Sequence, residues 1–474
     1  MRIWIFRIGL AALLGMPLGL AAAPAWQTCH LPGERDALHC AAIAVPRDYA
    51  DASRGSFDIH VAVARSIRTR AEADPLFVLA GGPGQAGSDI VFLLDTALAK
   101  VRASRDIVFI DQRGTGRSGR LGCADDADAL TLRDSELQAS TLACLKGFGP
   151  DLLLHTTAAA VEDLERVRLS LGYARINLWG ASYGSRLAQA YAQRYPTTVR
   201  SLILDGVVDA DLIIGAESYQ FQAALDAVLQ RCTDDADCGR AFPALRTQLR
   251  DVLQRLDADA AATTLAHPRS GQPAHVRISR QRLLQTIRHL LYSTRGAAQL
   301  PYLIARADAG DWRPLLAIQA SSIDLAAAQP AAGVLLAIAC REDWPRLTAA
   351  QRAREAQAGV FGAAGLASLD ELCGALALPP LPPSSVQTLT PPALLLSGAL
   401  DPVTPPVRAD RALRTLPQGQ HVVAAHAGHV ISGLGCAPAL LRRFLDAPLR
   451  TIDATCLGEI VLPAFQTSAA GASP

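Results

Sequence analysis

The chain has 474 residues, 50% of them hydrophobic, so it can bury a large core. Single hydrophobic cores stop growing near about 250–300 residues, which predicts a main domain and a second module. The formal net charge of +1 provides no general electrostatic attraction for nucleic acid or for an anionic membrane, and neither is expected as a partner.

The first 25 residues have the pattern of an export signal. Arg2 and Arg7 flank the start, residues 8–20 are apolar, and small residues follow as far as Ala25. The alternative, a membrane anchor, is disfavoured because the apolar run is short for a bilayer and is interrupted by glycines and a proline. We expect residues 1–25 to be a signal peptide. The mature protein is then exported, periplasmic or extracellular, and is not inserted into a membrane.

Strand-like and helix-like segments alternate between Phe57 and Val208. The candidate strands lie at 57–63, 76–80, 107–110, 176–179 and 199–204. Two of them are continuous apolar runs, as in a sheet that is buried on both faces. Helical repeats cover 157–171 and 183–195. This alternation favours an α/β fold with a mainly parallel sheet and helices on both of its faces.

The loop at 81–87 allows a second interpretation. Gly82, Gly84 and Gly87 form the pattern Gly-x-Gly-x-x-Gly after a strand, and Asp111 ends the next strand, as in a dinucleotide-binding unit. Pro83, however, removes an amide that should bind phosphate, and an exported protein meets little NAD. A nucleotide would also leave the serine described next without a role, so no cofactor is expected.

The pentapeptide GASYG, 180–184, lies where a strand candidate meets a helix candidate. A serine on such a turn adopts a strained backbone conformation, for which the flanking glycines leave room. The hydroxyl of Ser182 is then exposed at the end of the sheet, and we interpret it as a nucleophile. The alternative is a glycine-rich turn without function, because Gly-x-Ser-x-Gly is common by chance.

The character of the sequence changes after Asp209. As far as about Pro380 it is rich in alanine and leucine, helical in pattern and poor in strand signals, and a proline-rich segment ends this region. Strand-like runs resume at 393–396 and 421–425. The simplest organisation is an α/β core interrupted by a helical insertion. We place the core at 26–208 and 389–466, the insertion at 209–388 and a disordered tail at 467–474.

The two late strands are each followed by a candidate partner for the serine. Asp401 follows the first and His429 the second, so both are expected at the carboxyl ends of strands. The order Ser182, Asp401, His429 is that of an α/β-hydrolase triad. The alternatives are an Asx-turn at Asp401 and a structural loop histidine at His429. His426 is the second choice for the base, and Asp205 is the second choice for the acid.

Acyl transfer also needs amide donors for the negatively charged oxygen of the intermediate. One should be the amide of Tyr183, which follows the serine. The other should come from the loop at 81–87, for which we predict Gly82.

Ten cysteines occur, and they fall into near neighbours: 29 and 40, 123 and 144, 232 and 238, 340 and 373, 436 and 456. Connectivity does not follow from sequence, yet five short loops are the simplest pairing in an oxidising compartment. A zinc site would need close Cys-x-x-Cys pairs, which the sequence lacks, so disulfides are favoured and no metal is expected.

Together these motifs resemble the proline iminopeptidase and tripeptidyl aminopeptidase family of α/β-hydrolases, in its secreted form with a TAP-like C-terminal segment. The matching segments are GGPGQAGSD (81–89), DQRGTGRS (111–118), GASYG (180–184), SGALDPVTPP (397–406) and AGHV (427–430). The cysteines at 29, 40, 123, 144, 340, 373, 436 and 456 also lie where secreted members tend to have them. The resemblance spans nearly all of the mature chain.

The resemblance implies removal of one or a few residues from the free N-terminus of peptides, with the insertion as a cap over the site. Ser182 would attack, His429 would transfer the proton and Asp401 would hold the imidazole. Ala80 stands where proline iminopeptidases usually have histidine, which favours the tripeptidyl branch. A carboxylesterase with the same triad is an alternative, and a non-enzymatic binding protein on this scaffold is a more distant one.

An aminopeptidase must also bind the substrate ammonium, which requires a buried or half-buried carboxylate in the cap. The segment 340–344 contains one, and we predict Glu342, with Asp343 and Glu217 as rivals. The alternative is a solvated cluster of Arg, Glu and Asp. The expected partners are therefore peptides with a free N-terminus.

Overall fold

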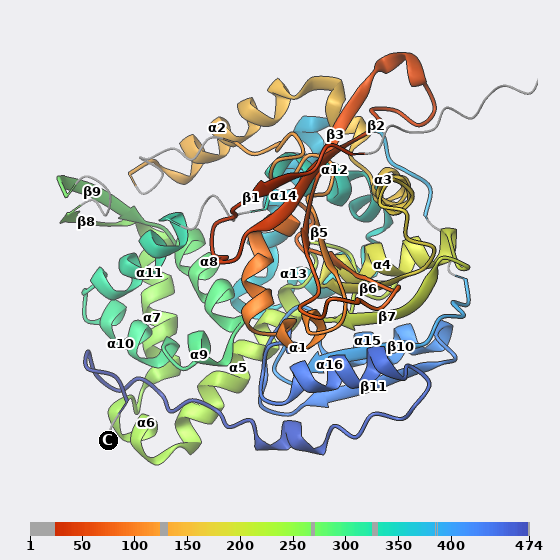
Figure 1. The fold of residues 1–474 in the computed structure, drawn as a ribbon. Helices are drawn as coiled ribbons and strands as arrows, with labels where there is room; N and C mark the ends of the chain where they lie inside the picture. The colour runs from red at the N-terminus through yellow and green to blue at the C-terminus, as the bar shows by residue number, and fades with distance from the viewer. Residues whose placement is uncertain are drawn as a thin grey trace, which may run out of the picture.

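The computed structural model describes residues 24–123, 131–266, 271–324, 330–383, 385 and 387–472 (Figure 1). The predicted signal peptide lies outside these residues except for its last two, and so do the last two residues of the predicted tail. Residues 467–472 of that tail form a turn in which Ser468 pairs with Gly471.

A nine-stranded sheet forms the centre of the described structure. In spatial order its strands are β1 (Gln27–Cys29), β2 (Leu38–Pro46), β3 (Ser56–Ala64), β5 (Ile107–Ile110), β4 (Leu76–Leu79), β6 (Ile176–Ala181), β7 (Val199–Asp205), β10 (Ala393–Gly398) and β11 (Gly419–Ala424). In this order, the first four strands, β1, β2, β3 and β5, pair antiparallel with one another. From β5 onward, through β4, β6, β7 and β10 to β11, each neighbouring pair is parallel. The predicted mainly parallel α/β sheet is therefore confirmed.

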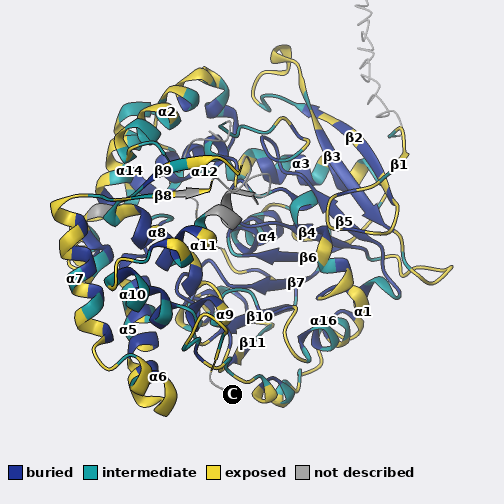
Figure 2. Ribbon diagram, turned by 90° about the vertical axis from the view of Figure 1, so that its left-hand side faces the viewer, coloured by how far each residue is buried: buried dark blue, intermediate teal, exposed yellow. Residues whose placement is uncertain are grey.

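Helices cover both faces of this sheet, because its central strands are apolar on both sides. One face packs against α3 (Thr157–Ser170), α4 (Tyr183–Arg194) and α15 (Pro406–Ala412). The other packs against η2 (Gly87–Asp95), α1 (Ala99–Arg102) and α16 (Ala437–Asp446). Figure 2 shows the result: the central strands are buried, whereas the covering helices expose their outer sides.

Between β7 and β10 the described residues add no strand to this sheet and form a mainly helical insertion, which lies beside the sheet in Figure 1. Its helices are α5 (Ser218–Asp234), α6 (Ala236–Ala241), α7 (Leu245–Ala258), α8 (Arg280–Leu291), α9 (Thr294–Ala297), α10 (Leu300–Asp308), α11 (Arg313–Asp324), α12 (Ala332–Ile338), α13 (Ala349–Ala356) and α14 (Gly362–Leu376). Helices α5 to α11 share a separate apolar core that includes Phe221, Leu253 and Ile287, whereas Val334 and Ile338 of α12 pack into the core of the central sheet.

The remaining helical elements are short, apart from α2 (Asp134–Gly147). They are η1 (Ala52–Arg54), η3 (Gly149–Leu154), the π-helical turn η5 (Ala339–Asp343), η6 (Trp344–Arg346), η7 (Gly359–Phe361), η8 (Leu413–Thr415) and η9 (Thr455–Glu459).

Two groups of strands lie outside the predicted set. The insertion contains an antiparallel hairpin of β8 (Ala261–Ala266) and β9 (Pro273–Ile278), and β1 and β2 extend the central sheet at its N-terminal edge. Both β2 and β8 are rich in alanine, which is a weak strand former, so residue type does not mark them as strands. Pairing with a neighbouring strand stabilises them instead.

All ten cysteines pair as the five short loops predicted: Cys29–Cys40, Cys123–Cys144, Cys232–Cys238, Cys340–Cys373 and Cys436–Cys456. Each disulfide closes within the sheet-forming part of the chain or within the insertion.

Within the described residues, one helical stretch, 359–376, is long and apolar enough to cross a membrane by length and composition alone. Two contacts tie it to the rest of the insertion. Asp370 accepts a hydrogen bond from the indole of Trp344 at 2.8 Å, and Cys373 is bonded to Cys340.

Candidate active site

Ser182 occupies a strained turn between β6 and α4. Its φ of 53° and ψ of −124° lie in a region that side chains other than glycine rarely adopt. A Cβ on Gly180 would overlap the carbonyl of Gly184, and a Cβ on Gly184 would overlap that of Leu79. The two glycines therefore let the helix start directly against the strand, which presents the serine at the end of the sheet.

His429 and Asp401 form a buried pair at the carboxyl ends of β11 and β10. Nδ1 of His429 lies 2.8 Å from Oδ2 of Asp401, and the side chain of Asp401 is fully buried. The carboxylate also accepts hydrogen bonds from the amides of Val403 and Thr404, each at 2.8 Å, and from the Thr404 hydroxyl at 2.7 Å. These bonds fix the carboxylate so that it orients the ring of His429.

Burial and charge act in opposite directions on this pair. Burial lowers the pKa of the His429 imidazole, but the charge of Asp401 and its hydrogen bond outweigh it, so this pKa is raised above its usual value. Burial likewise raises the pKa of Asp401, yet His429 and the donors from Thr404 outweigh it, so this pKa is lowered. Asp401 thus stays ionised and holds the imidazole proton on Nδ1, which leaves Nε2 free to accept a proton.

Tyr292 at the end of α8 was not predicted to belong to the site. Its ring meets the ring of His429 edge to face, with centroids 5.3 Å apart, and its carbonyl accepts a hydrogen bond from the amide of His429 at 2.8 Å. The insertion thereby contributes directly to the position of the histidine. Nothing in the local sequence around Tyr292 signals this contact.

Asp205, the second choice for the acid, connects the serine turn to the histidine loop. Its carbonyl accepts from the amide of Ser182 at 2.9 Å, and its carboxylate accepts from the amides of Ile431 and Ser432. A Cβ on the next residue, Gly206, would lie 2.9 Å from Cε1 of His429. The end of β7 therefore contacts both the backbone of Ser182 and the ring of His429.

His426, the second choice for the base, lies elsewhere. It is exposed, and its Nδ1 is 2.8 Å from the carbonyl oxygen of Ile460. The structure thus combines Asp401 with His429 and leaves the two second choices in other roles.

The glycine loop after β4 lies against the serine. A Cβ on Gly81 would be 3.1 Å from Cβ of Ser182, and Gly82 has a positive φ of 100°. In the described part of the chain, neither the amide of Gly82 nor that of Tyr183 donates a hydrogen bond to another residue. Both amides are thus available as the predicted oxyanion donors.

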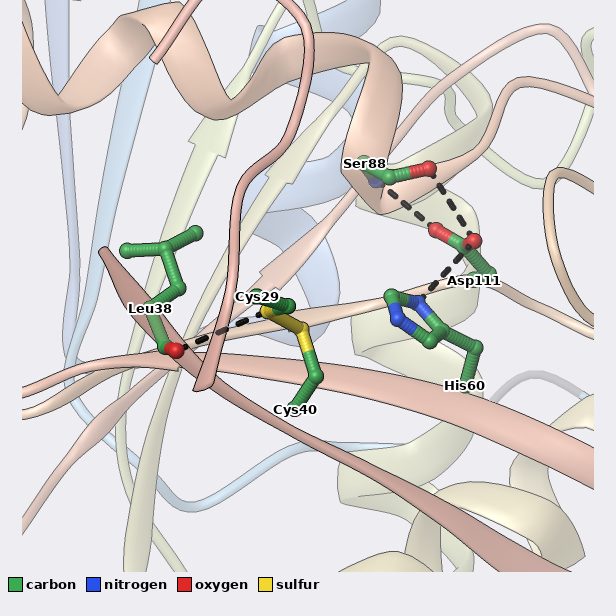
Figure 3. The surroundings of a disulfide bond; sticks show 6 residues. All are labelled: Cys29, Leu38, Cys40, His60, Ser88 and Asp111. Carbon is green, nitrogen blue, oxygen red and sulfur yellow. Dashed lines mark hydrogen bonds and ion pairs between the residues drawn. A yellow bond between two sulfur atoms is a disulfide. The ribbon is translucent and has the colours of Figure 1, made fainter. Parts of the chain in front are cut away.

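Asp111 binds Ser88, the first residue after this loop, and contacts His60, as Figure 3 shows. Its carboxylate accepts from the amide and hydroxyl of Ser88 at 2.7 and 3.0 Å and from the amide of Arg117 at 2.8 Å. His60 adds an ion-pair contact at 3.3 Å. The dinucleotide alternative required this carboxylate for a ribose, whereas here both of its oxygens bind protein groups. Among the described residues, no cluster of His, Cys, Asp or Glu side chains could hold a metal ion.

Glu342 lies beside the residue that follows the serine. Its two carboxylate oxygens accept from the amide and hydroxyl of Thr157 at 2.8 and 2.6 Å, and the Thr157 hydroxyl lies 2.9 Å from the hydroxyl of Tyr183. Burial raises the pKa of Glu342 despite these bonds. Each oxygen retains a second lone pair, so the carboxylate can still accept from a ligand.

The two rivals of Glu342 have other partners. Asp343 is buried in an ion pair with Arg186, whose Nη1 donates to both carboxylate oxygens at 2.9 and 3.1 Å. Glu217 is buried too; it accepts from the amide of Gly215 at 2.9 Å and lies 3.6 Å from Arg288. Both carboxylates thus already face a guanidinium, whereas the hydrogen-bond partner of Glu342 is neutral.

Comparison with known proteins adds a family and several relatives. A family model described as "alpha/beta hydrolase fold" matches residues 74–435, more than half of the chain. The protein named putative hydrolase YuaR from Escherichia coli (strain K12) is 27% identical over 238 residues, which cover 45% of this chain and 48% of that protein.

Two further relatives agree with the resemblance found in the motifs. Serine protease Hip1 from Mycobacterium tuberculosis (strain ATCC 25618 / H37Rv) is 31% identical over 222 residues, 42% of each chain. Tripeptidyl aminopeptidase from Streptomyces lividans is 27% identical over 224 residues, 42% of this chain and 40% of that protein. This chain therefore spans less than half the length of the curated relatives that it matches.

Proposed function

Because this chain belongs to the alpha/beta hydrolase family, we propose that it is an exported serine exopeptidase that removes one or a few residues from the N-terminus of peptides. The observation that supports this most directly is the buried Asp401–His429 pair beside the strained turn of Ser182. The names of the relatives, a serine protease and a tripeptidyl aminopeptidase, support the peptidase part of the proposal.

In the proposed reaction, Nε2 of His429 takes the proton from the hydroxyl of Ser182 as its oxygen attacks the substrate carbonyl. The amides of Gly82 and Tyr183 stabilise the oxyanion that forms. His429 then donates the proton to the departing amine, and the N-terminal fragment remains as an ester on Ser182. Water, deprotonated by His429, releases this fragment, and Asp401 stabilises the imidazolium in both steps.

Recognition of the substrate ammonium is assigned to Glu342. It is largely buried, its neighbours Thr157 and Tyr183 are neutral, and Tyr183 directly follows the nucleophile. An ammonium group beside it would lower the raised pKa of this carboxyl and would gain a charge-assisted hydrogen bond. An acetylated N-terminus has neither the charge nor the donors for this contact.

The deciding experiment compares peptide anilides that have a free N-terminus with their N-acetylated forms and with a small ester. We expect acetylation to lower kcat/KM about 10- to 100-fold, as loss of one charge-assisted hydrogen bond implies. Glu342→Gln should lose this discrimination and keep ester hydrolysis. Thr157→Val removes the hydroxyl hydrogen bond to Glu342, keeps the one from the backbone amide and leaves the carboxylate charge in place, so it should keep the discrimination.

Two results would contradict the proposal. If acetylated peptides are cleaved as fast as free ones, the exopeptidase assignment fails and the role of Glu342 with it. If only the ester is cleaved, the protein is a carboxylesterase. Loss of both activities in Ser182→Ala would separate either case from a contaminating enzyme.

Export is proposed from the leader-like residues 1–25 together with the five disulfides, because such bonds persist in oxidising compartments. The site needs neither nucleotide nor metal in this mechanism, because Ser182 supplies the nucleophile and His429 moves the protons.

A further inference from the structure

Two adjoining chambers lie at the boundary between the insertion and the sheet-forming part, and we call them together the seam cavity. The apolar chamber has a volume of about 430 Å³ and the arginine chamber one of about 630 Å³. Arg354, Arg408 and Arg411 line both, so the chambers are continuous at these three side chains. The mechanism above places no substrate in either chamber, although Asp401 lines the apolar one.

Small and aliphatic side chains line one part of the apolar chamber, and polar side chains such as Ser293, Asp401 and His426 line the rest. Ala223, Ala227 and Val228 of α5 face Leu400 and Pro405 from the loop after β10. These five side chains offer no hydrogen-bond partner, so burying the amides of a peptide against them would leave the hydrogen bonds of those amides unmet. An unbranched alkyl chain has no such groups and needs only apolar contact.

The arginine chamber is lined by five arginines and two carboxylates, Asp211 and Glu355. Arg408 already pairs with Asp209 at 3.0 Å. Arg411 lies 3.7 Å from the same carboxylate and Arg354 lies 3.6 Å from Glu355, both beyond hydrogen-bond distance. These two guanidinium groups thus retain donors for an anion at the junction of the chambers.

Arg231 adds a further positive charge to the wall of the apolar chamber. It lines this chamber, and its guanidinium lies over the ring of Phe465 at 4.5 Å. Within the described residues, its buried Nε and one Nη have no hydrogen-bond partner. Its charge adds to the positive potential at this boundary, which favours an anionic ligand over a cationic one.

We infer that the seam cavity binds an anionic amphiphile with a single alkyl chain, its chain in the apolar chamber and its head at Arg354 and Arg411. A free fatty acid and a lysophospholipid share this chemistry. The occupant would touch Leu400 and Asp401, which line the apolar chamber, and so would contact the loop that orients His429.

The test is calorimetric titration of the full-length mature protein with dodecanoate below its micelle concentration. A parallel titration with lysophosphatidylglycerol tests whether the ligand is a free fatty acid or a lysophospholipid. Tighter binding of either one supports the site. We expect one site per chain. Arg354→Gln and Arg411→Gln should each weaken binding about tenfold, as loss of one charge-assisted contact implies. Ala227→Phe should block the apolar chamber, and Arg443→Gln, an exposed arginine that lines neither chamber, should change nothing.

Three controls can overturn the inference, and thermal melts of each variant exclude misfolding as the cause of lost binding. Dodecyltrimethylammonium binding as tightly as dodecanoate would mean that the arginines have no role. Inorganic phosphate binding as tightly would remove the need for a chain. Displacement of dodecanoate by an acidic tripeptide would make the cavity a peptide site. Binding is measured here without substrate, so its failure is distinct from a failure of the proposed peptidase activity.

Discussion

Asp401 has four hydrogen-bond donors around it, and their arrangement favours this carboxylate as the acid of the proposed triad. The amides of Val403 and Thr404 and the Thr404 hydroxyl hold it in an Asx-type turn, while Oδ2 faces His429. The two alternatives weighed for Asp401, turn residue and catalytic acid, are therefore the same conformation: the turn is what aims the carboxylate at the histidine.

Asp401→Asn is expected to move the pH profile as well as the rate. Because Asp401 raises the pKa of His429, its neutralisation lowers that pKa, and the acid limb of kcat/KM against pH should shift to lower pH. The maximal rate should fall about 10⁴-fold, since the imidazole loses its preferred tautomer. Thr404→Val keeps the charge and should leave the acid limb in place. If the acid limb of kcat/KM stays at the same pH in Asp401→Asn, a group other than His429 is responsible for it.

At the scale of elements, the turn from β6 to α4 depends on two glycines that cannot be replaced without moving the backbone. A Cβ at Gly184 would overlap the carbonyl oxygen of Leu79 in the neighbouring strand β4. The close approach of α4 to the sheet sets the direction of the Tyr183 amide. The close packing of α4 against β4 therefore matters both for the stability of the fold and for the proposed oxyanion site.

Gly184→Ala should therefore reduce both stability and activity. The clash is with backbone, so we expect a loss of about 2 kcal/mol or more in the free energy of unfolding, together with a large fall in kcat. Gly374→Ala is the matched control: a Cβ there meets nothing within 4 Å in helix α14. It should gain up to about 1 kcal/mol, because alanine is the better helix former. Urea unfolding and steady-state kinetics of both variants measure these effects, and an active, stable Gly184→Ala protein would contradict them.

The elements that position the site were predictable because each has a recognisable pattern in the local sequence. Apolar runs indicated the central strands, and the glycine spacing indicated the serine turn. Strands β2 and β8 have no such sequence pattern, because pairing with β3 and β9, rather than residue type, makes them strands. The contact between Glu342 and Thr157 joins residues 185 positions apart, and a single sequence contains no trace of such a contact. The position of Tyr292 against His429 could not be predicted for the same reason.

At the scale of the whole molecule, the disulfides divide according to the length of chain that they close. The Cys340–Cys373 bond spans 33 residues and ties the turn that carries Glu342 to α14, whereas Cys232–Cys238 spans 6 residues. Longer loops lose more entropy when they are closed in the unfolded chain. The first bond should therefore stabilise the protein more.

Removing Cys340–Cys373 by double alanine substitution should cost about 4 kcal/mol, and removing Cys232–Cys238 about 2 kcal/mol, by loop entropy alone. Chemical unfolding of protein recovered from the periplasm or the medium measures both. The unsubstituted exported protein should contain no free thiol and should begin near Trp26. Ten reactive thiols in that fraction would contradict the proposed export, and equal losses from the two variants would contradict the entropic account.

None of the five disulfides joins the insertion to the sheet-forming part. Across that boundary the contacts are reversible ones, such as Arg186 with Asp343, Arg408 with Asp209 and Thr157 with Glu342. The disulfides therefore constrain the insertion and the sheet-forming part separately, and no covalent bond between side chains crosses the boundary. Contacts of this kind can break and re-form without the cleavage of any covalent cross-link.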